Sequence, residues 1–179
     1  MKLLRTVALD PSDTFVFDPA AEPGEWAVSG VFRFWDDDPE ALRGKARSAF
    51  RSGFLGLTSW GWSTLVEIVE VTDSDRAAAV ELLARQLVDR LGAPDIATAR
   101  QAAAEEVGFA ESLCADATGA LIAVHRTVKD GEIHESFRAL RSRGESRHQR
   151  AFAFLQVEED EQPADDVDLS GIASEHRGQ

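Results

Sequence analysis

Two histidines stand in a segment whose pattern predicts a β-hairpin. Asp130-Gly131 is a strong two-residue turn signal between the apolar-rich runs 120–128 and 133–140. Because side chains alternate along a strand, His125 and His134 are expected on one face, diagonal to one another and pointing away from the core. This face is predicted to carry no carboxylate that could complete a metal site. Both histidines are therefore candidate ligand-binding residues, with solvated sheet residues as the alternative, and no metal site is predicted.

Tryptophans are the second group of candidates, because aromatic side chains often line ligand pockets. Trp60 and Trp62 flank Gly61, and Trp35 ends an earlier aromatic run. We expect these three tryptophans to be ligand-binding residues. Gly61 could allow close approach of a ligand or of another backbone segment, and a packing bulge explains it equally well. The alternative is that the indoles fill the core between a sheet and the helices that cover it.

Three arginines repeat every four residues in a segment expected to be helical, residues 39–51. Arg43, Arg47 and Arg51 would then lie along one side of the helix. Guanidinium groups in this arrangement suit an anion or an acidic protein partner, whereas the alternative is a solvated helix face. A second group of arginines lies between residues 138 and 150, and the chain's own acidic C-terminal segment is a further candidate occupant of such a site.

No group of residues predicts catalysis. Gly53 and Gly56 lack the Lys-Ser/Thr pair of a phosphate-binding loop, and Ser63 has no identifiable base. Cys114 is the single cysteine, which excludes a disulfide within the chain and a cysteine-based structural zinc site. Its expected place near the C-terminus of a helix, on or beside the apolar stripe, disfavours a thiolate. We predict no catalytic residue and no cofactor.

Composition and charge restrict the partners. The 179 residues are 44% hydrophobic and carry a formal net charge of −13, which argues against nucleic acid or an anionic membrane as partner. Residues 158–179 hold eight acidic residues and one arginine, and therefore −7 of this charge. They are expected to be a disordered acidic tail after a globular domain of residues 1–157. No apolar stretch has the length of a membrane span or of a signal-peptide core, which predicts a cytoplasmic protein.

The order of elements predicts the fold. Residues 52–72, SGFLGLTSWGWSTLVEIVEVT, are interpreted as the central strand of the sheet. Further elements are expected as strands at 2–9, 14–17, 26–35 and 151–157 and as helices at 39–51, 74–91 and 95–114. In the hairpin, Val128 is expected to pair with Ile133 and Val124 with Phe137. The result is a single-domain α+β fold, a mostly antiparallel sheet with a helical hairpin and one further helix packed on one face.

Four segments together resemble a known family: LDPSDTFVF, EPGEWAVSG, the run from FRSGFLGL to GWSTLVE, and the run from LIAVHR to DGEIHESFR. The family consists of short bacterial proteins and is known as a domain of unknown function. The resemblance covers roughly residues 3–141, and residues 53–67 are its most particular part. It implies a bacterial, cytosolic, stand-alone domain, and it implies no activity, ligand or catalytic residue.

These observations favour a non-catalytic binding or accessory protein that acts through a protein partner. An assembly factor or a small subunit of an enzyme system would fit this description. The alternative is a small-molecule-binding protein or an unrecognised enzyme that uses the tryptophans, with His125 or His134 as polar groups. A homo-oligomer is compatible with either function.

Overall fold

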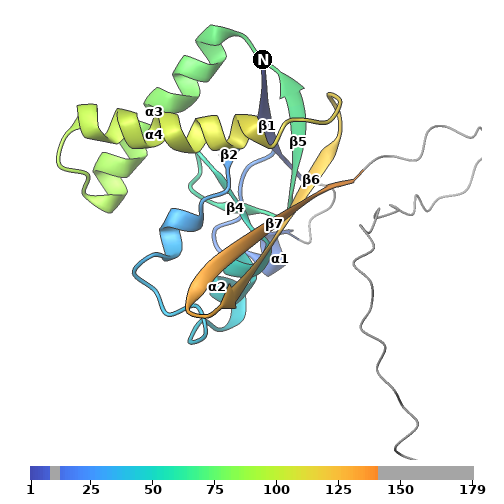
Figure 1. Cartoon of the computed structure of the whole chain (residues 1–179), viewed down its shortest axis with the longest axis vertical. Coiled ribbons are helices and arrows are strands. Elements are labelled where there is room, and N and C mark those ends of the chain that lie inside the picture. Colours follow the sequence, from blue (N-terminus) through green and yellow to red (C-terminus); the bar gives the residue numbers. More distant parts are fainter. Residues whose placement is uncertain (9–12, 141–179) are drawn as a thin grey trace, which may run out of the picture.

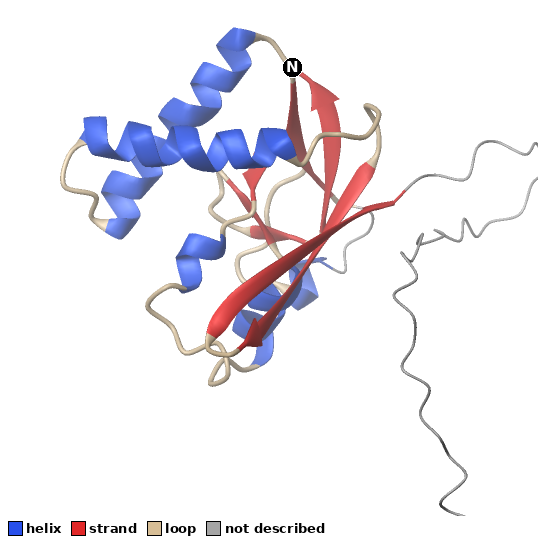
Figure 2. Ribbon diagram, in the orientation of Figure 1, coloured by secondary structure: helices blue, strands red, loops and turns tan. Residues whose placement is uncertain are grey.

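The computed structural model describes residues 1–8 and 13–140, which form an antiparallel sheet with helices packed against it (Figure 1). The strands of this part follow the order β4-β3-β2-β1-β5-β6-β7. Their bounds are β1 (Lys2–Val7), β2 (Trp26–Val28), β3 (Phe54–Gly56), β4 (Trp62–Ser63), β5 (Leu65–Glu70), β6 (Leu121–Lys129) and β7 (Glu132–Leu140). The helices are α1 (Asp13–Val16), the 3-10 helix η1 (Val31–Phe34), α2 (Gly44–Ser52), α3 (Asp73–Leu91) and α4 (Ile96–Ser112) (Figure 2). The α+β class is as expected.

The β6–β7 hairpin has the predicted turn and register. Asp130 and Gly131 occupy the turn with φ of 54° and 78°, the left-handed conformation that a tight hairpin turn requires. The register pairs Val128 with Ile133 and Val124 with Phe137. The same hairpin is joined to the rest of the sheet through β5, and β5 pairs with β1 in the middle of the strand order.

The predicted helical hairpin is also present, because both helices carry strong capping signals. Thr72 caps α3, where the Thr72 hydroxyl accepts from the Asp75 N–H at 3.2 Å and the Asp75 carboxylate accepts from the Thr72 N–H at 2.9 Å. Gly92 ends α3 with φ of 69°. Asp95 caps α4 by accepting from the Thr98 N–H at 2.8 Å. Helix α4 packs on β1 and β2, and α3 packs against α4 (Figure 1).

The prediction of one central strand over residues 52–72 is wrong. The segment forms β3, β4 and β5, and the chain reverses between β3 and β4. Trp60 lies in this reversal with φ of 60°. Gly61 allows the close backbone approach that was expected there, because a Cβ would lie 2.5 Å from the backbone of Ala20. The Trp62 N–H donates to the Pro19 carbonyl at 3.0 Å across this contact.

Two expected strands at the N-terminal side are also wrong in whole or in part. Residues 14–17 belong largely to helix α1, because a run of four residues is too short for periodicity to separate a helical turn from a strand. The strand expected over 26–35 ends at Val28. Gly30 then turns the chain with φ of 76°, and η1 follows.

The helix expected over residues 39–51 begins five residues later, at Gly44. The Asp38 carboxylate does not cap this helix; it accepts from the Glu40 N–H at 3.0 Å within a local turn. Gly44 has φ of 56°, which interrupts any right-handed helix that would run through it. Arg43 therefore stands at the N-cap of α2 and not on its side.

Several expectations fall on residues 9–12 and 141–179, outside the described residues. They include the strand 151–157, the arginines from 141 to 150 and the acidic tail 158–179. Among the helices that the structure describes, none is long and apolar enough to cross a membrane.

Candidate functional site

A surface pocket of about 390 Å³ lies between α2, the loop before it and β6. Its lining consists of the loop residues Pro39 and Glu40, the helix residues Arg47, Phe50 and Arg51, and the strand residues Arg126, Thr127 and Val128. Phe50 is buried in the hydrophobic core, so its side of α2 faces the interior of the protein. The pocket is thus built on two elements of regular structure, which hold its side chains in place.

Arg47 and Arg51 supply the exposed charge of this pocket. They are one helical turn apart on α2, so their side chains emerge on the same side of the helix, and both are exposed. Within the described part of the chain, neither guanidinium has an ion-pair or hydrogen-bond partner. Two free positive groups therefore face a concave surface whose one lining carboxylate is Glu40.

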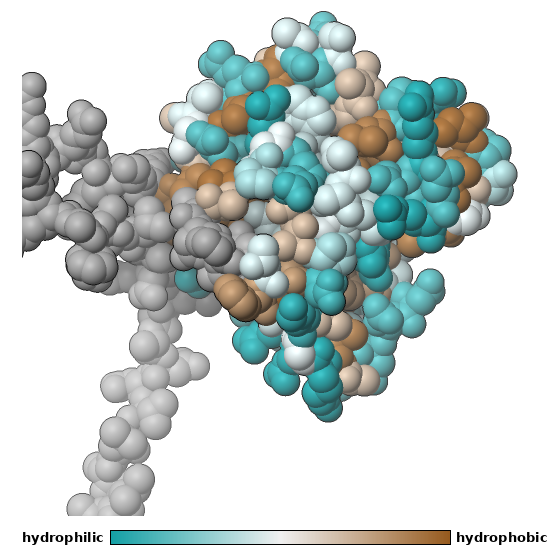
Figure 3. All heavy atoms as spheres, turned by 180° about the vertical axis from the view of Figure 1, so that it is seen from behind, coloured by the Kyte–Doolittle hydropathy of each residue, from teal (hydrophilic) through white to brown (hydrophobic). Residues whose placement is uncertain are grey.

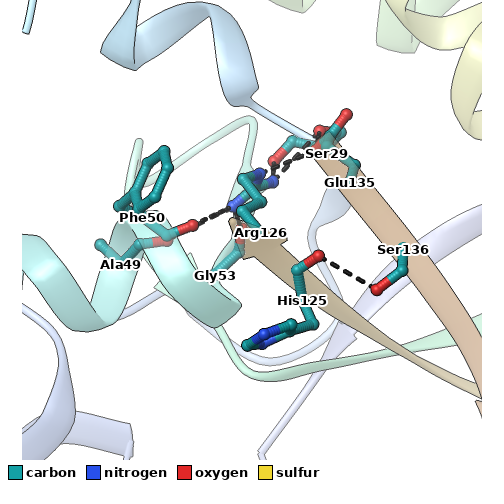
Figure 4. A network of polar contacts seen from close by, with 8 residues as sticks. All are labelled: Ser29, Ala49, Phe50, Gly53, His125, Arg126, Glu135 and Ser136. Carbon is teal, nitrogen blue, oxygen red and sulfur yellow. Dashed lines mark hydrogen bonds and ion pairs between the residues drawn. The ribbon is translucent and has the colours of Figure 1, made fainter. Parts of the chain in front are cut away.

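Arg126 underlies the pocket and is 1% exposed. It lies on the core-facing side of β6, as does Val124, and its guanidinium points into the molecule (Figure 4). Each of its three nitrogens donates. Nε donates to Glu135 Oε1 at 2.7 Å. Nη1 donates to the carbonyls of Phe50 at 2.9 Å, Gly53 at 2.8 Å and Ala49 at 3.4 Å. Nη2 donates to the Ser29 carbonyl at 2.5 Å and to the Ser29 hydroxyl oxygen at 3.1 Å.

Arg126 connects three parts of the fold through its hydrogen bonds. The carbonyls of Ala49, Phe50 and Gly53 belong to the C-terminal end of α2, where the helix dipole favours a positive charge. Ser29 follows β2, and Glu135 lies on β7 directly opposite Arg126. Arg126 therefore holds the helix that carries Arg47 and Arg51 against the hairpin.

The charge of Arg126 is balanced locally. Burial lowers the pKa of its guanidinium, whereas the adjacent Glu135 carboxylate raises it. Glu135 also accepts a short hydrogen bond from the Ser29 hydroxyl. Helix α4 brings a second carboxyl group near Glu135, that of Glu106, and burial together with Glu135 and Glu105 raises the pKa of Glu106 to about 7. Glu106 is thus a titratable group at the edge of the network.

A buried carboxylate outside this network, that of Glu25, stabilises the turn between β3 and β4. One oxygen of Glu25 accepts from the backbone N–H groups of Thr58 and Ser59, both at 2.8 Å, and the other accepts from the N–H of Glu22 at 2.6 Å. Glu25 is 8% exposed. Since three backbone donors occupy the carboxylate, we assign it to the support of this turn.

The chemistry available in the pocket is binding of an anion through charge. Guanidinium groups present several fixed donors to a carboxylate or phosphate and stay protonated at neutral pH. Among the described residues, no cluster of His, Cys, Asp and Glu could hold a metal ion. Cys114 lies elsewhere, at the end of α4, where burial raises the pKa of its thiol to about 11 and the thiol donates to the Ala110 carbonyl at 3.3 Å.

The structure separates the tryptophans that the sequence groups together. Trp60 and Trp62 are 5% and 4% exposed and lie in the core, where Trp62 stacks on Phe34 with ring centroids 5.2 Å apart. Trp35 is 71% exposed, beyond the end of η1. The three indoles therefore do not share one pocket.

The structure places the two histidines where the hairpin pattern predicts them. His125 and His134 are exposed and diagonal on neighbouring strands, opposite Ser136 and Thr127 respectively. His125 points away from the Arg126 network (Figure 4). Neither histidine lines the pocket, so a role in ligand binding remains a prediction for both.

Of the three arginines in the expected ridge, the structure brings two to the pocket. Arg43 lies at the N-cap of α2, where its guanidinium donates to the carbonyls of Glu40 and Leu42. It is absent from the pocket lining, whereas Arg47 and Arg51 belong to it.

Sequence reasoning missed Arg126 and Glu135, although the predicted register contains the signal. The alternation that makes Val124 core-facing makes Arg126 core-facing too, and the same register sets Arg126 opposite Glu135. A pair of opposite charges at inward positions of a hairpin indicates a buried ion pair.

Comparison with known proteins gives the family. No curated protein and no solved structure matches this chain. A family profile does match, over residues 1–158, and covers the described sheet, its helices and the pocket. The chain therefore belongs to the family of unknown function DUF6505.

Proposed function

We propose that this protein is a non-catalytic binding protein, an accessory protein that holds an acidic group of a protein partner in the pocket between α2 and β6. The observation that carries the proposal is the pair of exposed guanidinium groups, Arg47 and Arg51, which face a concave surface and have no partner within the described residues. A carboxylate can accept two parallel hydrogen bonds from one guanidinium, so a partner with two neighbouring carboxylates would engage both arginines.

The charge of the whole chain favours a compact acidic segment over a polyanion. A formal net charge of −13 repels nucleic acid and anionic membranes at long range. Within the pocket, the two arginines act at close range against Glu40 alone, and α2 is held at a fixed position by Arg126. The buried, hydrogen-bonded state of the single cysteine fits a reducing compartment, and we place this function in the cytoplasm.

The test uses the full chain and a fluorescein-labelled hexaglutamate peptide, with binding followed by fluorescence anisotropy at low salt. The double variant R47A R51A should bind the peptide about tenfold or more weakly, and added salt should weaken binding to the wild type. The double variant R85A R138A is the matched control, because it removes the same charge from exposed arginines of α3 and β7 that lie outside the pocket.

Two results would overturn the proposal. One is equal binding by R47A R51A and the wild type; the other is an equal loss in R85A R138A. Competition with citrate or inorganic phosphate tests the alternative of a small-molecule ligand. If one of these anions displaces the peptide at a far lower concentration than free glutamate does, the small-molecule alternative is favoured. A tagged chain should then retain from native cytosol, at low salt, a stoichiometric partner that R47A R51A loses and R85A R138A keeps.

A further inference from the structure

Trp35 is a large apolar side chain that the fold holds at the surface. The indole is 71% exposed, yet its edge contacts Phe32 with ring centroids 6.3 Å apart. Phe32 is itself buried and contacts Trp60 at 6.1 Å. The face drawn in Figure 3 carries hydrophobic residues as separate patches among hydrophilic ones. An indole that is anchored on the core and open to solvent is the kind of residue that contributes most to protein interfaces.

Two arginines lie over Trp60, the residue that Phe32 connects to Trp35. The guanidinium carbons of Arg33, on η1, and Arg90, on α3, lie 5.3 and 5.7 Å from the ring centroid of Trp60. Gln86 holds Arg90 in place: its oxygen accepts from Arg90 Nε at 2.6 Å, while its nitrogen donates to the Leu57 carbonyl at 3.0 Å. Within residues 1–8 and 13–140, neither guanidinium has an ion-pair partner.

Negative charge lies close to Arg33 in the chain. Asp36, Asp37 and Asp38 directly follow Trp35, and all three are exposed. The pKa of Arg33 is lowered by burial and by Arg90, whereas Asp37 raises it, so Arg33 lies within electrostatic range of both groups. No ion pair joins Asp37 to either arginine in the described part. The region of the exposed Trp35 indole thus carries both signs of charge: Arg33 and Arg90 over Trp60, and the aspartates that follow Trp35 in the chain.

A surface with both signs of charge around one aromatic residue can pair with a second copy of itself. In a two-fold symmetric dimer each residue i that contacts j is matched by j contacting i, so acidic and basic groups of one copy meet their opposites on the other. A purely acidic partner would leave the three aspartates opposed, and a purely basic partner would oppose Arg33 and Arg90. A second copy of this chain satisfies both.

We propose that two copies of this chain associate through this surface, with the two Trp35 indoles in contact near the two-fold axis and the Asp36–Asp38 segment of each copy facing Arg33 and Arg90 of the other. The inference is independent of the proposed function, because it uses none of the pocket residues. A contact with one aromatic anchor and a few charge pairs per copy predicts weak association, with a dissociation constant of roughly 1–100 µM.

The first test is sedimentation velocity of the full chain over a concentration series. A monomer–dimer equilibrium should appear, and W35A should raise the dissociation constant about tenfold or more. F15A is the matched control, because Phe15 on α1 is also a largely exposed aromatic residue, 78% accessible, and lies outside this surface. F15A should associate as the wild type does.

The second test exchanges charges between copies. R90E and D37K should each remain monomeric, since each places like charges across the interface twice. An equimolar mixture of R90E and D37K should form a heterodimer, because one contact is then inverted and the other is native. Unchanged thermal unfolding of each variant shows that the fold is intact. A wild type that stays monomeric at all concentrations, or a dimer that W35A and both charge variants leave unchanged, would overturn the proposal.

Discussion

The pocket is lined by three arginines, Arg126, Arg47 and Arg51. The surroundings of Arg126 differ from those of Arg47 and Arg51. Arg126 has no exposed side-chain surface and donates from each guanidinium nitrogen to fixed acceptors of the protein. Arg47 and Arg51 are exposed and have no such acceptors in the described residues. The difference assigns the buried arginine to the fold and leaves the two exposed arginines free for a ligand.

The largest effect on stability is expected when Arg126 is removed. The variant R126M should lower the free energy of unfolding by about 3–5 kcal/mol, because it leaves the Glu135 carboxylate, on a side chain that is 13% exposed, and several carbonyls of α2 without their donor. Urea denaturation followed by circular dichroism measures the change. R138M is the control, since Arg138 is exposed on the outer side of β7 and should change stability by less than about 0.5 kcal/mol.

The double variant R126M E135L separates the ion pair from the backbone contacts. It should regain part of the loss, because no buried charge is left, but the carbonyls of Phe50 and Gly53 still lack a donor. If R126M costs no more than R138M, Arg126 has no structural role and the comparison fails.

The elements that the sequence predicts well are those with short-range signals. The capping residues Thr72 and Asp95 and the Asp130-Gly131 turn act within a few residues, and α3, α4 and the β6–β7 register follow from them. The reversal between β3 and β4 has no such signal. It depends on the approach of the Ala20 backbone to Gly61 and on the carboxylate of Glu25, both far away in the chain.

The same distinction explains how much of the candidate site could be predicted. The spacing of Arg47 and Arg51 on a helix is local, and it places both correctly. Arg126 could be placed on the core-facing side of its strand, but its acceptors are 76 residues away at Phe50 and 97 residues away at Ser29. Alternation gives the direction of a side chain, whereas only the folded chain shows what it reaches.

The pH dependence of stability tests the surroundings of the Arg126–Glu135 pair, because Glu106 interacts electrostatically with Glu135. The pKa of Glu106 is about 7 in the folded protein against an ordinary value of 4.5. Between these two pH values the unfolded chain loses the proton and the folded protein keeps it, so the free energy of unfolding falls as pH rises. Below pH 4.5 both states are protonated and above pH 7 both are ionised, so the penalty is fully present above pH 7.

The variant E106Q should therefore be more stable than the wild type above pH 7, by about 1–2 kcal/mol after allowance for partial solvent exposure, and nearly equal to it at pH 4.5. Urea denaturation at pH 4.5, 6 and 8 measures the difference. E105Q is the control, because Glu105 is exposed on α4 and should show a much smaller change. A difference between E106Q and the wild type that does not grow with pH would contradict the assignment.

The smallest effect on stability is expected where the effect on binding is largest. R47A R51A should change the free energy of unfolding by less than about 0.5 kcal/mol, since both side chains are exposed and have no partners in the described residues. It removes two positive charges from a chain whose formal charge is −13, but exposed charges interact weakly through solvent. Loss of hexaglutamate binding with unchanged unfolding would therefore show that these arginines are kept for a ligand. A destabilisation approaching that of R126M would instead show that they hold α2 in place, as Arg126 does.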